Sequence, residues 1–148
     1  MDLSQEIPPE SIAVKALADT WQDVITVAGD LLVAAGSTTA EYTQEMVETV
    51  EKLGPYIVIA PGIALAHSRP SPAVKRTGLS LATLAEPVEF GSKKNDPVRL
   101  VIGLAALDHS SHLEVMSSLA KLLADQDKVA ELINAENVEE ITAVLAGV

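Results

Sequence analysis

The sequence predicts an α/β fold, with one domain over residues 1–148 and a mixed central sheet of about four to five strands flanked by helices. Apolar residues recur at helical spacing in the first and last thirds of the chain, whereas short β-branched and apolar runs fill the middle third. A length of 148 residues is enough to bury one hydrophobic core. The order of helices, strands and helices is typical of a sheet covered on its faces.

Two helices are expected in the first third. Pro8–Ser11 favours a helix entry with Ser11 as the N-cap, and apolar residues from Ile12 to Ala35 follow helical spacing. Charged residues interrupt that stretch, which argues for a helix facing the core instead of a membrane span. A second helix is predicted over Thr39–Leu53, ending at Gly54–Pro55. Its buried stripe would consist of Tyr42, Met46, Val47 and Val50.

Strands are predicted in the middle of the chain, over Tyr56–Ala60, Ile63–Ala66, Thr77–Leu84 and Val98–Ala106. The last of these is a near-continuous apolar run, which suits a central strand covered on both faces. A polar loop, Gly91–Pro97, precedes it.

The last third is predicted to be helical. Ser111–Glu114 matches the capping-box pattern, with Ser111 as the N-cap and His112 as the first helical residue. Two shorter helices are expected over residues 126–134 and 138–145. The inner face of the first helix would consist of Leu113, Met116, Leu119, Ala120 and Leu123.

Composition excludes several classes of function. A formal net charge of −11 argues against nucleic-acid binding, which relies on clustered Lys and Arg. The absence of cysteine excludes disulfides, thiolate metal sites and a cysteine nucleophile. The first residues are acidic and lack the basic region of a secretory signal, so a cytoplasmic location is expected.

The three histidines fall in two short segments. His67 follows a predicted strand, and His109 and His112 lie around the predicted start of a helix. A neutral imidazole is available as a nucleophile near pH 7, and a helix amino terminus favours anions. We therefore predict that His67 carries a phosphoryl group and that His112, kept neutral by the helix end, helps to hold it. The alternative is that His67 is a structural histidine bonded to backbone, and His109 is expected in solvent.

A small basic cluster follows His67. Arg69 lies two residues further on, where an anion would be favoured, whereas Lys75 and Arg76 are predicted to lie in a solvated loop. A metal site at His109 and His112 would lack further ligands. The sequence contains neither a Gly-x-Ser-x-Gly elbow nor a glycine-rich nucleotide-binding loop, so a hydrolase and a nucleotide site have no support.

Three segments together resemble a known family. Pro61–His67, Val98–Ala106 and His112–Glu114 are similar, in order and spacing, to the enzyme IIA component of the bacterial phosphotransferase system, of the mannitol/fructose type. The segment Leu53–Pro70 is most similar to the ascorbate branch, which is related to the pentitol branch. The resemblance extends from about Glu41 to the end of the chain.

The resemblance implies a phosphoryl carrier with an α/β fold. His67 would take a phosphoryl group from the phosphocarrier protein HPr and pass it to a cysteine of enzyme IIB, while the membrane enzyme IIC imports a sugar acid such as ascorbate, or a polyol. By position, His112 steadies the phosphoryl group, and Arg69 and Ser111 are the predicted phosphate-binding residues. No metal or other cofactor is expected.

The chain also departs from the family pattern. Ala66 stands where members usually have proline, Ser68 where they have Gly, Ala or Cys, and the upstream arginine of the mannitol branch is missing, so Arg69 is predicted to replace it. Two alternatives stay open: a regulatory enzyme IIA-like protein that acts by phosphorylation-dependent protein binding, and an inactive relative. The docking face is expected around His67, including Ile63, Leu65 and Leu113, and a homodimer is left open.

Overall fold

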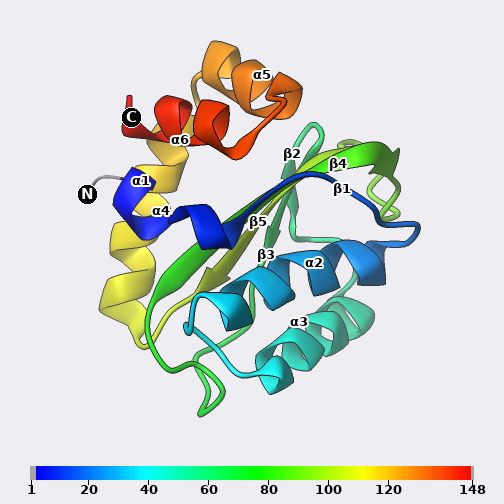
Figure 1. Cartoon of the computed structure of the whole chain (residues 1–148). Helices are drawn as coiled ribbons and strands as arrows, with labels where there is room; N and C mark the ends of the chain where they lie inside the picture. Colours follow the sequence, from blue (N-terminus) through cyan, green and yellow to red (C-terminus); the bar gives the residue numbers. More distant parts are fainter. Residues whose placement is uncertain (1–2, 148) are drawn as a thin grey trace.

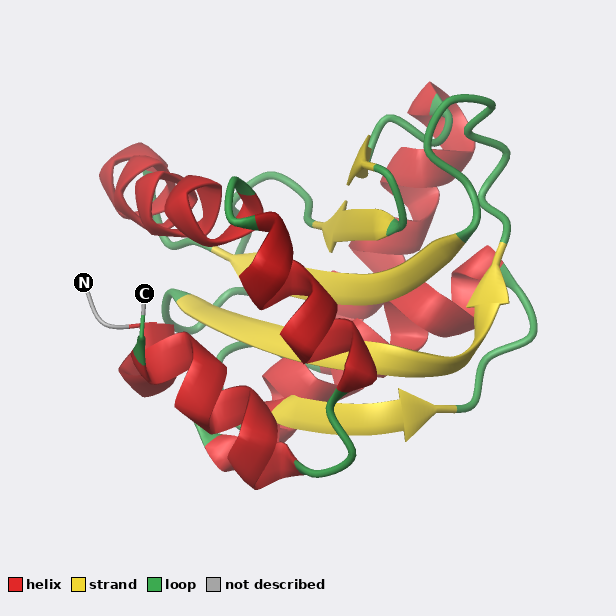
Figure 2. Ribbon diagram, turned by 90° about the horizontal axis from the view of Figure 1, so that it is seen from above, coloured by secondary structure: helices red, strands yellow, loops and turns green. Residues whose placement is uncertain are grey.

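A computed structural model describes residues 3–147 as one five-stranded mixed sheet between two layers of helices (Figures 1 and 2). The strand order is β1-β4-β5-β3-β2; β1 is parallel to β4 and β3 to β5, and the other two pairs are antiparallel. The elements are α1 Leu3–Glu6, a 3-10 turn at Pro9–Ser11, β1 Ile12–Ala16, α2 Trp21–Ala34, α3 Ala40–Leu53, β2 Val58–Ala60, β3 Ile63–Ala66, β4 Gly78–Val88, β5 Val98–Ala105, α4 His109–Leu123, α5 Gln126–Asn134 and α6 Val138–Ala146. The predicted fold class is confirmed.

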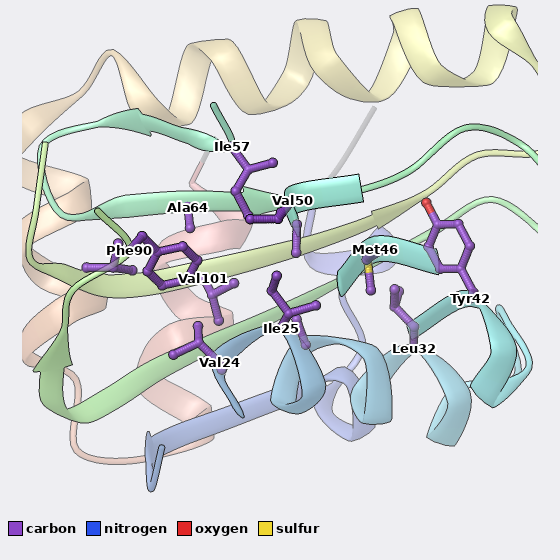
Figure 3. Packing of buried hydrophobic residues seen from close by; sticks show 14 of the residues in the cluster. Val24, Ile25, Leu32, Tyr42, Met46, Val50, Ile57, Ala64, Phe90 and Val101 are labelled. Atoms are coloured by element: carbon purple, nitrogen blue, oxygen red, sulfur yellow. The ribbon is translucent and has the colours of Figure 1, made fainter. Parts of the chain in front are cut away.

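The helices form two layers with separate cores. Helices α2 and α3 cover one face of the sheet, whereas α4, α5 and α6 lie on the other, where α1 packs against α6 (Figures 1 and 2). In Figure 3, Ile25 and Met46 of the first helical layer lie in one buried cluster with Val101 of the sheet. The second core contains Leu119 and Ile141.

The middle strand, β5, serves both cores. Leu100, Ile102 and Leu104 belong to the core under α4–α6, whereas Val101 and Ala105 belong to the core under α2 and α3. This alternation follows from the period of two along a strand, and both faces are apolar because helices cover both. The prediction of a central strand with two covered faces is confirmed.

Most other predicted elements are confirmed with small changes at their ends. Helix α3 begins after Thr39 and ends at Leu53, and α5 spans Gln126–Asn134 as expected. Strand β4 continues beyond the predicted Leu84 to Val88, and β2 begins only at Val58.

The predicted helix from Ile12 is wrong at its start. Ser11 ends a 3-10 turn, and Ile12–Ala16 is an edge strand parallel to β4. Helix α2 begins only after Thr20, whose side-chain oxygen accepts a hydrogen bond from the amide of Asp23. The apolar residues of this short segment fit either period, and pairing with β4 decides between them.

Helix α4 begins earlier than predicted. Its N-cap is Asp108, not Ser111, because the Asp108 carboxylate accepts a hydrogen bond from the Ser111 amide at 2.8 Å. The predicted inner face is only partly correct: Leu119 is buried, but Leu113 is 56% exposed and Ala120 is exposed. The side chains that α4 buries are Val115, Leu119 and Leu122, set by the angle at which the helix lies on the sheet.

Candidate functional site

The two histidine segments meet at one edge of the sheet. His67 directly follows β3, and α4 with His109 and His112 follows β5 after a short loop. Because β3 and β5 are parallel neighbours, their carboxyl ends lie side by side. A cavity of about 370 Å³ opens there, lined by Thr49, Leu53, Tyr56, His67, Ser68, Arg69, Pro70, His109 and His112.

The ring of half-buried His67 is held by the backbone. Its Nδ1 lies 2.8 Å from the carbonyl oxygen of Leu65. A carbonyl can only accept, so Nδ1 carries the proton and the neutral ring keeps its lone pair on Nε2. The ring of Tyr56 meets that of His67 edge-on, with centroids 5.7 Å apart and planes at 77°. The structure thus defines the tautomer of the neutral His67 ring, in which Nε2 is the free nitrogen.

His112 lies beside His67, with ring centroids 6.4 Å apart and planes at 52°. Burial lowers the pKa of His112 below 6.5, and the charges of His67 and then His109 add to the effect. The predicted neutral state of His112 is therefore supported, but its causes are burial and the neighbouring histidines and not the helix end. A neutral imidazole still carries one N–H that can donate a hydrogen bond.

Arg69 contributes positive charge to the cavity. It is exposed and lies among the lining residues. Burial of Tyr56 raises the pKa of its hydroxyl, and the guanidinium of Arg69 partly opposes that rise. Lys75 and Arg76 are exposed and are not among the lining residues. The Arg76 guanidinium donates to the carbonyl of Ala35 just beyond α2, in keeping with the predicted solvated loop.

Ser111 is not among the residues that line the cavity. Its amide donates to the carboxylate of Asp108, which lowers the pKa of that carboxyl. A carboxylate thus already occupies the amino end of α4, so the predicted cap geometry does not form. His109 is exposed, as expected, yet it lines the cavity as the first residue of α4.

Several lining residues were not predicted from the sequence. Thr49 and Leu53 come from the last turns of α3, and Tyr56 from the loop that follows. Beneath them lies the buried Tyr42, seven residues before Thr49 and therefore on the same side of α3. The seven-residue spacing of Tyr42 and Thr49 places two hydroxyl groups along the otherwise apolar side of α3. This pattern is the sequence signal that could have pointed to these lining residues.

The expected apolar docking face is partly wrong. Ile63 and Leu65 are only 3% and 2% exposed, because both point into the core under α4–α6. Leu113 is exposed as expected. Of the exposed large apolar side chains, Leu53 and Tyr56 line the cavity, whereas Leu107 and Leu113 are close in sequence to the lining residues His109 and His112.

Two further properties of residues 3–147 concern metal binding and membrane-spanning helices. Within that range, no group of three or more His, Cys, Asp or Glu side chains is arranged to hold a metal ion. Nor is any helix within it long and apolar enough to cross a membrane.

Comparisons with known proteins identify the family to which this fold belongs. The ascorbate-specific phosphotransferase-system EIIA component of Escherichia coli K12 is 41% identical over 133 residues, 89% of this chain and 86% of that protein. The mannitol-specific cryptic phosphotransferase enzyme IIA CmtB from E. coli superimposes with a TM-score of 0.90 at 30% identity, over the full length of both chains.

A third relative was solved with a partner, in the complex of mannitol enzyme IIA and phosphorylated mannitol enzyme IIB from E. coli. It has a TM-score of 0.84 at 33% identity, over 96% of this chain and 98% of that one. A family model, described as phosphoenolpyruvate-dependent sugar phosphotransferase system, EIIA 2, matches residues 6–147. The resemblance read from the three sequence segments is thereby confirmed, and the chain belongs to the EIIA 2 family of the phosphoenolpyruvate-dependent sugar phosphotransferase system.

Proposed function

We propose that His67 accepts a phosphoryl group from HPr and passes it to a cysteine of enzyme IIB, for uptake of ascorbate or a related sugar acid or polyol. The observation that carries this proposal is the pairing of His67, whose Nδ1 is held by the carbonyl of Leu65, with the imidazole of His112 in one cavity. The ascorbate-specific names of the relatives support the substrate class. Their mannitol-specific structural counterpart supports an enzyme IIB partner.

In the first transfer, the Nε2 lone pair of His67 attacks the phosphorus of phospho-HPr. A new N–P bond forms and the donor's P–N bond breaks. The electron pair of the broken bond returns to the donor ring nitrogen, which takes up a proton from solvent, while Nδ1 of His67 keeps the proton that it donates to the Leu65 carbonyl. In the second transfer, an enzyme IIB thiolate attacks the same phosphorus. The S–P bond forms, and the electron pair of the breaking N–P bond returns to Nε2 of His67.

His112 and Arg69 stabilise the charge that moves during both transfers. Phosphoryl transfer depends on positioning and electrostatic stabilisation of the equatorial oxygens. The N–H of His112 and the guanidinium of Arg69 are donors that line the same cavity as His67. The hydrogen bond from Nδ1 of His67 to Leu65 keeps the attacking nitrogen free of a proton.

Both partners are proposed to dock on the apolar rim formed by Leu53, Tyr56, Leu107 and Leu113. HPr as phosphoryl donor and enzyme IIB as phosphoryl acceptor must both reach Nε2 of His67, so they must use the same cavity entrance one after the other. Exposed leucine and tyrosine side chains beside a polar cavity are suited to such contacts.

The test is intact-mass analysis after incubation with phosphoenolpyruvate, enzyme I and HPr. We expect one acid-labile phosphoryl adduct, its absence from His67→Ala, and its retention in the matched variant His109→Ala, because His109 is an exposed histidine of the same cavity. An adduct that persists in His67→Ala, or none in the folded wild-type protein, would refute the assignment. Adding an ascorbate-type enzyme IIB should then remove the adduct, whereas retention of the adduct would favour a regulatory protein.

A further inference from the structure

The hydroxyl of Tyr42 lies where β3 and β5 part. The last registered pair of the two parallel strands is Ala66 with Gly103. In a parallel ladder the next bond on this side would run from the Ser68 amide to the Leu104 carbonyl. Instead, the Tyr42 hydroxyl accepts from the Ser68 amide at 2.9 Å and donates to the Leu104 carbonyl at 2.8 Å. A side chain of α3 therefore takes the place of a bond between strands.

This hydroxyl is held in the interior. Tyr42 is completely buried, and Figure 3 shows its ring rising from α3 toward the strand layer. Burial is the largest of the causes that raise the pKa of Tyr42 to about 12. The hydroxyl therefore stays protonated at neutral pH, which it must do to donate to Leu104 while it accepts from Ser68.

A second residue of α3 reaches the same point. The hydroxyls of Thr49 and Ser68 are 3.1 Å apart, so α3 holds Ser68 by its side chain as well as by its backbone. Ser68 directly follows His67, and Leu104 lies on the strand that leads to α4 and His112. The bonds of Tyr42 to Ser68 and to Leu104 thus join the chain segments that carry the two histidines.

We propose that Tyr42 is a positioning residue for phosphoryl transfer: its inserted hydroxyl holds the end of β3 apart from β5, so that His67 and His112 can serve one phosphoryl group. This inference rests on the proposed function. Without the hydroxyl, the Ser68 amide would bond directly to the Leu104 carbonyl, and His67 would move with Ser68. A displacement of about 1 Å at a reacting group is sufficient to slow transfer severely.

Tyr42→Phe tests the proposal, with Ser80→Ala as the matched control. Ser80 is also completely buried, and its hydroxyl donates to the Ala28 carbonyl at 2.8 Å, on the face of α2 and away from the cavity lining. Both variants lose one buried hydroxyl bond. We expect Tyr42→Phe to be phosphorylated by phospho-HPr at least about tenfold more slowly than wild type, and Ser80→Ala to react at the wild-type rate.

A spectroscopic measurement separates positioning from stability. In Tyr42→Phe we expect the Ser68 amide and His67 ring resonances of the unphosphorylated protein to shift, whereas in Ser80→Ala they should not. Equal transfer rates in the two variants, or unchanged resonances in Tyr42→Phe, would overturn the proposal. These resonances test the positioning role of Tyr42 even if the wild-type protein accepts no phosphoryl group. A wild-type protein that accepts none would refute the proposed function instead.

Should Tyr42→Phe fail to fold, the wild-type protein still provides a test. The buried hydroxyl proton of Tyr42 is expected to exchange slowly with water and to show a nuclear Overhauser effect to the Ser68 amide proton. Absence of that contact in a folded sample in which the hydroxyl proton is observed would refute the inserted hydroxyl.

Discussion

The rings of His67 and His112 lie with their centroids 6.4 Å apart and their planes at 52°, although His67 lies in the loop after β3 and His112 in α4. The separation leaves room for a phosphoryl group on His67 to accept a hydrogen bond from His112. Both rings border the same cavity as Arg69. The predictions below follow from this arrangement and from the packing that supports it.

The pKa of His112 should respond to the state of His67. Burial lowers it, and so do the positive charges that His67 and His109 carry when they are protonated, so His112 in the unphosphorylated protein should titrate below its ordinary value of 6.5. His67→Ala removes a repelling charge and some of the burial, and phosphorylation adds a dianion, so both should raise this pKa. Proton NMR titration of the ring measures it; a value above 6.5 before phosphorylation would contradict the prediction.

Replacing Arg69 should slow transfer without affecting the fold. Arg69→Ala removes a positive charge from the cavity lining, and we expect about a tenfold slower phosphorylation by phospho-HPr, with Arg69→Lys in between. Quenched-flow kinetics with labelled phosphate measure the rate. Arg76→Ala is the matched control, because Arg76 is exposed and bonds the Ala35 carbonyl instead. Unchanged rates in Arg69→Ala would show that this charge has no part in transfer.

A charge placed on the apolar rim should weaken docking. Leu113 is 56% exposed and directly follows His112, so we expect Leu113→Glu to reduce the affinity for HPr by about tenfold. Titration calorimetry with unphosphorylated HPr measures the affinity. Leu17→Glu adds the same charge at a leucine that is 85% exposed and outside the cavity lining, and it should bind normally. An equal loss of HPr affinity in both variants would point to net charge as the cause. An unchanged affinity in Leu113→Glu would show that HPr docks on a different surface.

Close approach of α2 and α3 should make Gly29 intolerant of a side chain. A Cβ at Gly29 would lie 2.1 Å from Oγ1 of Thr43, within overlap distance. Gly29→Ala should therefore lower the free energy of unfolding by about 1–3 kcal/mol, although alanine favours helix. Denaturant unfolding measures this change.

The double variant Gly29→Ala with Thr43→Ala should recover most of that loss. It removes the overlapping side chain, and the buried Oγ1 of Thr43 has no hydrogen-bond partner among the described residues. Additive losses in the double variant would show that the contact is not the cause.

Periodicity predicted the interior of the fold well and its ends less well. The apolar run of β5 is buried on both faces as expected, and so are Tyr42, Met46 and Val50 of the predicted α3 stripe, whereas Val47 is only partly buried. Such burial leaves a pattern within the element itself. The strand at Ile12–Ala16 was taken for helix, because only its pairing with β4 distinguishes the two. The start of α4 was misplaced because both Asp108 and Ser111 are good capping residues and the folded geometry selects Asp108.

The sequence by itself determined the family and the fold class, and it made His67, His112 and Arg69 candidate site residues, because residue type and spacing along the chain carry that information. Only the tertiary structure decided how these residues meet. It brought the ends of β3 and β5 together, placed Leu113 in solvent and Leu65 in the core, and set Tyr42 between Ser68 and Leu104. Such contacts join residues far apart in the chain, and they depend on how helices lie on the sheet, which no local pattern records.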